Sequence, residues 1–481
     1  MELTHQAVRK AYGIAIDGVL KYINKDREKN FLKMVDISEK FLGDIFSKEA
    51  YESTRNLIRD RDGKWMQYVN RALDELNPHV IKVTALNLGF ESAFGGYKKS
   101  LEMEKKHQCN IPWIILMDPT SACNLHCTGC WAAEYGHRMN LTFEEMDRVI
   151  TQGKEIGVYF YMYTGGEPLI RKDDIIRLCE KHKDCAFHAF TNGTLIDEEF
   201  CSEAVRVGNL SFSLSLEGFE GVNDQRRGSG TYEKVIKAMD LMKKYGLIFG
   251  TSICYTSHNI EEVSSDEFLD IIIEKGCRFT WYFHYMPVGN DASEELLPSR
   301  EQREYMYNRV REIRGREGGK QIFAMDFQND GEFVGGCIAG GRRYCHINPN
   351  GDVEPCVFIH YSGANIRKMS LLECLKQPLF LEYRKGQPFH ENHLRPCPML
   401  ENPEYLKEMV NRTCARSTDM QSPEEVGHLC DKCTRYSQEW EVAAEKLWEQ
   451  RQERSLKNAL HFTNFSIKAV SQANLRYGSV K

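Results

Sequence analysis

The chain has 481 residues, more than one ordinary hydrophobic core accommodates, so we expect two or three structural units. Lys and Arg number 63 against 69 Asp and Glu, a net charge of −6, which argues against a nucleic-acid-binding protein because such proteins usually carry a basic surplus. No apolar run approaches the ~20 residues of a membrane span, so no transmembrane segment is expected. The first residues lack the layout of a signal peptide, and a cytoplasmic location is expected.

The 17 cysteines are distributed unevenly along the chain. Disulfides are not expected in a reducing cytoplasm, and clustered cysteines there indicate metal or iron–sulfur ligation. One group comprises Cys123, Cys127 and Cys130, and a second group extends from Cys337 to Cys433. Five others lie in apolar or helical surroundings and are interpreted as ordinary buried thiols. These are Cys179, Cys185, Cys201, Cys254 and Cys277.

Residues 1–105 are predicted to be helical throughout. Apolar residues recur there at steps of three and four, as at Val8, Tyr12 and Ala15, which is the spacing of one helical face. The Gly95-Gly96 pair marks the end of this region.

From residue 113 short apolar runs alternate with helix-period stretches, which predicts parallel strands joined by right-handed crossovers. Six strands suit a partial (β/α)6 barrel within residues 106–330, an α/β fold. In the second strand we expect Tyr161 and Tyr163 on one face, opposite Phe160 and Met162, because side chains alternate along a strand. The expected strands cover 113–120, 158–164, 186–192, 210–218, 248–256 and 278–287.

Beyond residue 330 the alternation stops. Residues 331–440 are rich in Cys, Gly and Pro and poor in periodic runs, so this small domain needs ligated metal to hold it together. The sequence PNGDV within it predicts a hairpin turn between two short strands. Residues 441–481 read as a helix followed by a tail.

The pattern Cys123-x-x-x-Cys127-x-x-Cys130 directly follows the first predicted strand. Three thiolates can ligate three irons of a 4Fe–4S cluster, which normally takes four cysteines, and so leave one iron open for a ligand. The loop would lie at the carboxyl end of the strand, where barrel enzymes build their active sites. A zinc site or unrelated thiols are the alternative.

The loop DPTSACNLHCTGCW resembles the signature of the radical S-adenosylmethionine (SAM) superfamily. The resemblance implies that the open iron binds the amino and carboxylate groups of SAM. It further implies reductive cleavage of SAM to methionine and a 5′-deoxyadenosyl radical, which abstracts hydrogen from an unactivated C–H bond. An anaerobic enzyme with an electron donor such as flavodoxin or ferredoxin is then expected.

Two further motifs fall where this family has them. Gly165, Gly166, Glu167 and Pro168 resemble its GGEP motif, which implies that backbone and carboxylate hold the methionine ammonium. Asn192 lies in a Thr-Asn-Gly stretch that resembles a SAM-contacting turn, although a plain turn is an equal alternative.

Ser215, Glu217 and Arg227 match a third stretch of the family, with the first two implied near the ribose and the Arg near the SAM carboxylate. Glu217 replaces the usual Asp and Asn223 the usual His. Many members also carry an aromatic residue before the third cysteine, where this chain has a glycine. Trp131, on the other side of that cysteine, is a candidate replacement for stacking on adenine.

The second cysteine group resembles the SPASM extension, which holds auxiliary iron–sulfur clusters in many radical SAM enzymes. The resemblance implies that Cys337, Cys345 and Cys356 ligate a first auxiliary cluster, with a fourth ligand from further along. A second auxiliary cluster, or structural zinc at the final Cys-x-x-Cys pair, stays open. The downstream candidates are Cys397, Cys414, Cys430 and Cys433.

Three hypotheses of function remain. The first, which is the expected one, is a SPASM-type maturase that oxidises a peptide or protein. The second, its alternative, is the same chemistry on a lipid or other hydrophobic substrate, with C–C bond formation. The third is a non-catalytic iron–sulfur or zinc scaffold, which would leave the SAM motifs without a purpose. A long apolar cavity beside the cysteine loop would favour the hydrophobic substrate, and a wide polar groove would favour the peptide.

Overall fold

Parallel strands form the centre of the molecule, as the alternation of apolar runs and helices predicts. The computed structural model describes residues 3–42, 47–315 and 319–477. Its main sheet has the order β7-β6-β5-β4-β3-β2-β1-β8-β9, and all neighbours are parallel except β8 and β9. The strands are β1 (Ile114–Met117), β2 (Phe160–Tyr163), β3 (Ala186–Thr191), β4 (Leu210–Ser215), β5 (Phe249–Tyr255), β6 (Phe279–His284), β7 (Phe323–Asp326), β8 (Tyr344–Ile347) and β9 (Val353–Glu354).

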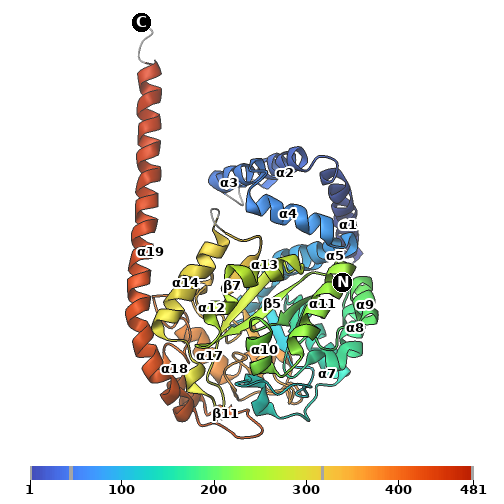
Figure 1. Ribbon diagram of the computed structural model, residues 1–481, viewed down its shortest axis with the longest axis vertical. Coiled ribbons are helices and arrows are strands. Elements are labelled where there is room, and N and C mark those ends of the chain that lie inside the picture. Colours follow the sequence, from blue (N-terminus) through green and yellow to red (C-terminus); the bar gives the residue numbers. More distant parts are fainter. Residues whose placement is uncertain (1–2, 43–46, 316–318, 478–481) are drawn as a thin grey trace.

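Helices between successive strands cover the outer face of this sheet (Figure 1). Helix α7 begins with a capping box in which Thr142 and Glu145 satisfy each other's backbone N–H groups. The helices are α7 (Phe143–Glu155), α8 (Lys172–Lys181), α9 (Glu198–Val207), α10 (Glu220–Arg227), α11 (Thr231–Tyr245), α12 (Ile260–Val263), α13 (Asp266–Glu274) and α14 (Arg300–Arg314), with shorter turns η2 (Trp131–Tyr135), η3 (Pro168–Arg171) and η4 (Glu294–Leu296).

The side chains of β2 alternate between the two faces of the sheet, as expected for a strand. Tyr161 and Tyr163 are fully buried in the layer between sheet and helices, whereas Phe160 and Met162 belong to the cluster inside the barrel. The prediction is confirmed, and Met162 lies on the face that borders the internal cavity.

The N-terminal region is helical, as predicted, and it covers the amino ends of the barrel strands. The Asn87 amide donates to the carbonyl of Cys185 at 2.6 Å, and the Arg71 guanidinium donates to that of Cys277 at 3.2 Å. These carbonyls lie one residue before β3 and two residues before β6. The elements are α1 (Leu3–Ile23), α2 (Arg27–Leu42), α3 (Lys48–Arg59), α4 (Lys64–Glu75), α5 (Pro78–Thr84), the π-helix η1 (Ala85–Gly96) and α6 (Tyr97–His107).

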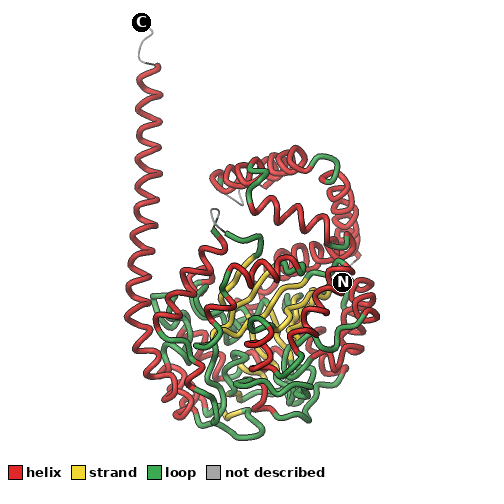
Figure 2. The backbone as a smooth tube through the Cα atoms, viewed as in Figure 1, coloured by secondary structure: helices red, strands yellow, loops and turns green. Residues whose placement is uncertain are grey.

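The C-terminal region does not stand apart from the barrel. β8 pairs in parallel with β1, and the predicted turn joins it to β9, so this hairpin extends the barrel sheet beyond the boundary expected at residue 331. The last helix begins earlier than expected and projects away from the body (Figure 2). The elements are α15 (Gly331–Val334), β10 (Tyr361–Ser362), α16 (Leu371–Leu375), α17 (Pro378–Gly386), α18 (Pro403–Thr413), β11 (Arg416–Ser417) and α19 (Val426–Tyr477). Within the described ranges, no helix combines the length and apolar content needed to cross a bilayer.

Candidate active site

The three cysteines of the first motif meet at one cavity. They follow β1 on a loop at the carboxyl end of the sheet, and all three line a cavity of about 720 Å³ inside the barrel. None is in a disulfide. Burial raises the pKa of the Cys123 thiol to about 11, so a metal is needed to hold it as thiolate near neutral pH.

Gly165 and Gly166 bring the second loop against the cysteine loop. A side chain at Gly166 would lie 2.2 Å from the carbonyl oxygen of Ala122, and Gly165 has a φ of 101°. The Gly166 N–H donates to Thr120 and the Glu167 N–H donates to Ala122. These two N–H groups hold the cysteine loop in place. Gly165 and Gly166 also line the cavity, and the expectation that their backbone approaches a ligand stays a prediction.

Glu167 borders the cavity with its carboxylate buried. It accepts hydrogen bonds from the Thr191 hydroxyl at 2.6 Å and from the backbone N–H groups of Asn192 at 2.7 Å and Leu169 at 2.9 Å. Burial raises the pKa of Glu167, opposed by these donors. The Asn192 amide also lies 3.9 Å from the Cys123 sulfur, so strands β2 and β3 both contribute to the cysteine loop's surroundings. Pro168 starts η3 and is not among the residues lining the cavity.

Ser215 and Arg227 line the cavity as expected, but Glu217 does not. Glu217 is fully buried and pairs with two arginines, at 2.7 Å from Arg226 and through the Nε of Arg227 at 3.0 Å. Its role here is to hold both guanidinium groups at the cavity wall. Arg227 in turn lies 3.8 Å from the Cys127 sulfur. Sequence reasoning missed Arg226, although its place beside Arg227 was the available signal.

The aromatic residue that many family members carry before the third cysteine is replaced here by Gly129. Its φ of 66° and the Tyr285 ring, 2.7 Å from where a side chain would begin, both exclude larger residues. Tyr285 comes from the end of β6 and lines the cavity, a contribution that sequence reasoning missed. Trp131 also lines it, with its ring packed edgewise against His346 at 5.8 Å and Phe358 at 6.3 Å.

Most of the clustered cysteines share one kind of hydrogen bond to their sulfur. In five cases the sulfur accepts a bond from the backbone N–H two residues further along, a donor that favours thiolates in iron–sulfur sites. Cys345 has no such donor, and its pKa is raised by burial and by nearby Cys374. The five cysteines are Cys123, Cys130, Cys337, Cys356 and Cys397.

Three cysteines of the second group meet at a neighbouring cavity. Cys337, Cys356 and Cys397 line a space of about 510 Å³. The Tyr344 hydroxyl donates to the Cys356 sulfur at 2.6 Å, and the buried Tyr383 hydroxyl, close to all three thiols, has no hydrogen-bond partner in the described part of the chain. This donor set and the orphaned hydroxyl fit a buried sulfur-rich cluster.

The other four candidates do not line this cavity. Cys345 is a correction to the expected set, because it follows Tyr344 on β8 and so faces the opposite side of the sheet, in the core beneath the helices. Cys414 is exposed at the end of α18, and Cys430 and Cys433 share one face of the first turns of α19. Among the described residues no His, Cys, Asp and Glu side chains group as ligands of a single metal ion. Ligands of a four-iron cluster lie further apart, each on its own iron.

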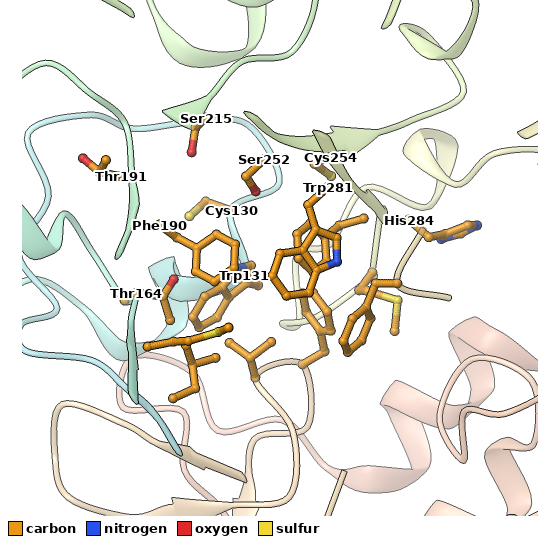
Figure 3. Close-up of a pocket in the computed structure, with 18 of the residues that line it drawn as sticks. Cys130, Trp131, Thr164, Phe190, Thr191, Ser215, Ser252, Cys254, Trp281 and His284 are labelled. Atoms are coloured by element: carbon orange, nitrogen blue, oxygen red, sulfur yellow. The ribbon is translucent and has the colours of Figure 1, made fainter. Parts of the chain in front are cut away.

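The walls of the first cavity are mainly apolar. Figure 3 shows the rings of Trp131, Phe190 and Trp281 turned toward one space, with Cys130 nearby. Phe327 and Phe358 line both cavities, as does Trp281, so the apolar space extends from the first group of cysteines to the second.

Comparison with known proteins matches these two sites to two families. The model of the Radical SAM superfamily matches residues 117–272, and that of the SPASM iron–sulfur cluster-binding domain matches residues 337–399. These two domains imply a SAM-binding 4Fe–4S cluster and an auxiliary iron–sulfur cluster.

Similar proteins carry out different reactions. An AdoMet-dependent heme synthase of Methanosarcina barkeri is 25% identical over 55% of this chain and 82% of its own length. A PqqA peptide cyclase of Granulibacter bethesdensis is 28% identical over 60% of this chain and 80% of its own. The mycofactocin maturase MftC of Mycolicibacterium smegmatis is 26% identical over 52% of this chain and 65% of its own. The crystal structure of Streptococcus suis SuiB aligns over 60% of this chain and 72% of that one, at 21% identity with a TM-score of 0.49.

Proposed function

Because this chain belongs to the radical SAM superfamily and carries a SPASM domain, we propose that it is an enzyme that abstracts hydrogen from an unactivated C–H bond of a hydrophobic chain. The observation that carries the substrate class is the apolar wall of the cavity beside Cys123, Cys127 and Cys130. A cavity of this kind desolvates an alkyl chain favourably but offers a peptide backbone few hydrogen-bond partners.

The roles of the chain's own residues follow from their positions. Cys123, Cys127 and Cys130 would hold the first cluster, which with bound SAM supplies the 5′-deoxyadenosyl radical. Arg227 and Arg226, held by buried Glu217, present positive charge to the SAM carboxylate.

Four other residues are proposed to contact SAM. Glu167 keeps acceptor capacity toward the methionine ammonium, and Ser215 presents its hydroxyl to the cavity. Trp131 and Tyr285 provide aromatic surface for adenine at the place left open by Gly129. The apolar rings around them exclude water, which protects a radical from stray hydrogen donors.

Cys337, Cys356 and Cys397 would hold the auxiliary cluster, because they share one cavity and one pattern of sulfur hydrogen bonds. Cys430 is a candidate fourth ligand because the buried Tyr383 ring lies near all four sulfurs. An electron donor such as flavodoxin or ferredoxin, and a cytoplasmic, anaerobic setting, belong to the same proposal, since reductive cleavage of SAM needs an electron and a reduced cluster.

Deuterium transfer tests the substrate class. The reconstituted enzyme is given SAM, a strong reductant and a phospholipid with perdeuterated acyl chains, and 5′-deoxyadenosine is analysed by mass spectrometry. Incorporation of deuterium into 5′-deoxyadenosine is expected, because the abstracted atom is retained there. Unlabelled 5′-deoxyadenosine together with an unchanged lipid would refute the proposal.

A peptide substrate is the second candidate, and the relatives favour it. The PqqA peptide cyclase and the mycofactocin maturase are named for peptide chemistry, and both resemble this chain over half its length or more. Deuterium transfer from a labelled peptide, with none from labelled acyl chains, would select this alternative.

A further inference from the structure

The internal cavity reaches the surface at α15, on the segment that joins β7 to β8. Phe333 and Val334 line both cavities, yet 63% of Phe333 and 46% of Val334 are exposed. All the other residues that line the first cavity are buried or half-buried. Two apolar side chains therefore stand at the opening where a substrate would enter.

A second exposed apolar stripe lies close to this opening. The Arg343 guanidinium, which lines the cavity, lies 5.6 Å from the centre of the Tyr97 ring at the start of α6. Leu101 is four residues from Tyr97 on α6, so these two share one helical face, and Phe94 precedes them near the end of η1. Phe94 is 67% exposed and Leu101 39%. We call Phe94, Tyr97, Leu101, Phe333 and Val334 the mouth surface.

Cations without carboxylate partners surround the mouth surface. Arg342 donates to the backbone carbonyls of Cys337 and Val334, and Arg343 has no ion pair among the described residues. Lys98 and Lys105 continue the stripe of α6 at the same three- and four-residue spacing and are likewise unpaired in the described chain. α6 has four lysines against two glutamates, whereas the whole chain has a net charge of −6. The positive charge is thus local to the opening.

We propose that the mouth surface docks on a bilayer that contains anionic phospholipid, so that an acyl chain enters the cavity from the membrane. Exposed rings that alternate with lysine and arginine fit the boundary between headgroups and acyl chains, where the rings are buried and the cations reach phosphate. Moving a phospholipid out of its bilayer into water costs free energy, because its acyl chains become exposed. An opening that lies at the lipid surface lets the chain enter the cavity without that exposure. This inference rests on the proposed hydrophobic substrate.

Vesicle co-sedimentation of the full-length protein tests the docking. One set of vesicles is phosphatidylcholine alone, and the other contains about one third phosphatidylglycerol. Binding to the anionic vesicles is expected, weakening as salt is raised. Lys98→Gln with Lys105→Gln should lower binding at least about tenfold, because each cation near an anionic surface contributes measurably. Phe94→Ser with Phe333→Ser should lower it by a similar factor, about tenfold, through lost burial of the rings.

Matched controls separate the mouth surface from exposed residues in general. Val442 on α19 is 63% exposed. Lys234 and Lys237 on α11 are exposed on the outer face of the barrel and have no ion-pair partner among the described residues. Val442→Ser and Lys234→Gln with Lys237→Gln should leave vesicle binding unchanged. Equal binding by all variants, or no preference for anionic vesicles, would overturn the proposal.

The docking and the proposed function fail in different ways. Vesicle binding is measured without SAM or reductant, so it stands even if no lipid is converted. Conversion of detergent-dispersed phospholipid by a protein that does not bind vesicles would refute the docking and leave the hydrophobic substrate intact. Binding to vesicles with deuterium transfer only from a peptide would refute the substrate instead.

Discussion

The strongest test of the second cysteine site compares two cysteines that the sequence places together and the structure separates. Cys356→Ala removes a sulfur that lines the second cavity and accepts a hydrogen bond from Tyr344. Cys345→Ala removes a sulfur that faces the core on the other side of β8. If the ligand set inferred here is correct, only the first change removes an auxiliary cluster.

The magnitudes follow from the surroundings of each thiol. Losing one 4Fe–4S cluster removes about four irons per chain, so Cys356→Ala should hold about four fewer irons than the parent protein. Cys345 is fully buried among apolar side chains, and truncating it leaves a small cavity that costs about 1–2 kcal/mol of folding free energy. The iron content of the Cys345→Ala protein should equal that of the parent protein.

The assay is anaerobic reconstitution followed by iron and sulfide analysis of the purified protein, with thermal unfolding measured in parallel. A Cys374→Ala protein provides the matched control, because Cys374 is a buried neighbour of Cys345 that nothing assigns to a cluster. Loss of about four irons from Cys345→Ala together with full iron in Cys356→Ala would refute the reasoning from sulfur hydrogen bonds.

Three further outcomes are expected. Cys127→Ala should abolish the conversion of SAM to 5′-deoxyadenosine, and undiminished turnover would contradict the assignment of the first cluster. Glu401→Gln leaves the Arg303 charge unpaired at a place where both side chains are fully buried. The free energy of unfolding, measured by heat or denaturant, should fall by about 3–5 kcal/mol. A loss below about 1 kcal/mol would show that this ion pair is not needed for stability. Gly129→Ala places a methyl group against the Tyr285 ring at positive φ. It should therefore raise the KM for SAM, and it should also lower the free energy of unfolding. A KM equal to that of the parent would show that this corner of the cavity does not contact SAM.

Local sequence determined most of the fold and the first site. The alternation of apolar runs with helix-period stretches is a short-range property, so it predicted the parallel strands and the helical N-terminal region. The spacing of Cys123, Cys127 and Cys130 after a strand places all three on one short loop, and no other part of the chain is needed to bring them together. The alternating faces of β2 follow from strand geometry alone.

Only the tertiary structure decided which distant residues share a site. Cys345 and Cys356 are close in sequence, but the two-residue period of β8 turns Cys345 away, while Cys397 is brought in from a separate loop. Glu217 matches the family motif by position, yet it holds Arg226 and Arg227 instead of lining the cavity, because the last turn of α10 lies against the end of β4. The apolar wall beside the first cysteines arises for the same reason, since Phe190 on β3 and Trp281 on β6 are not on neighbouring strands, yet their ring centres lie 5.5 Å apart inside the barrel.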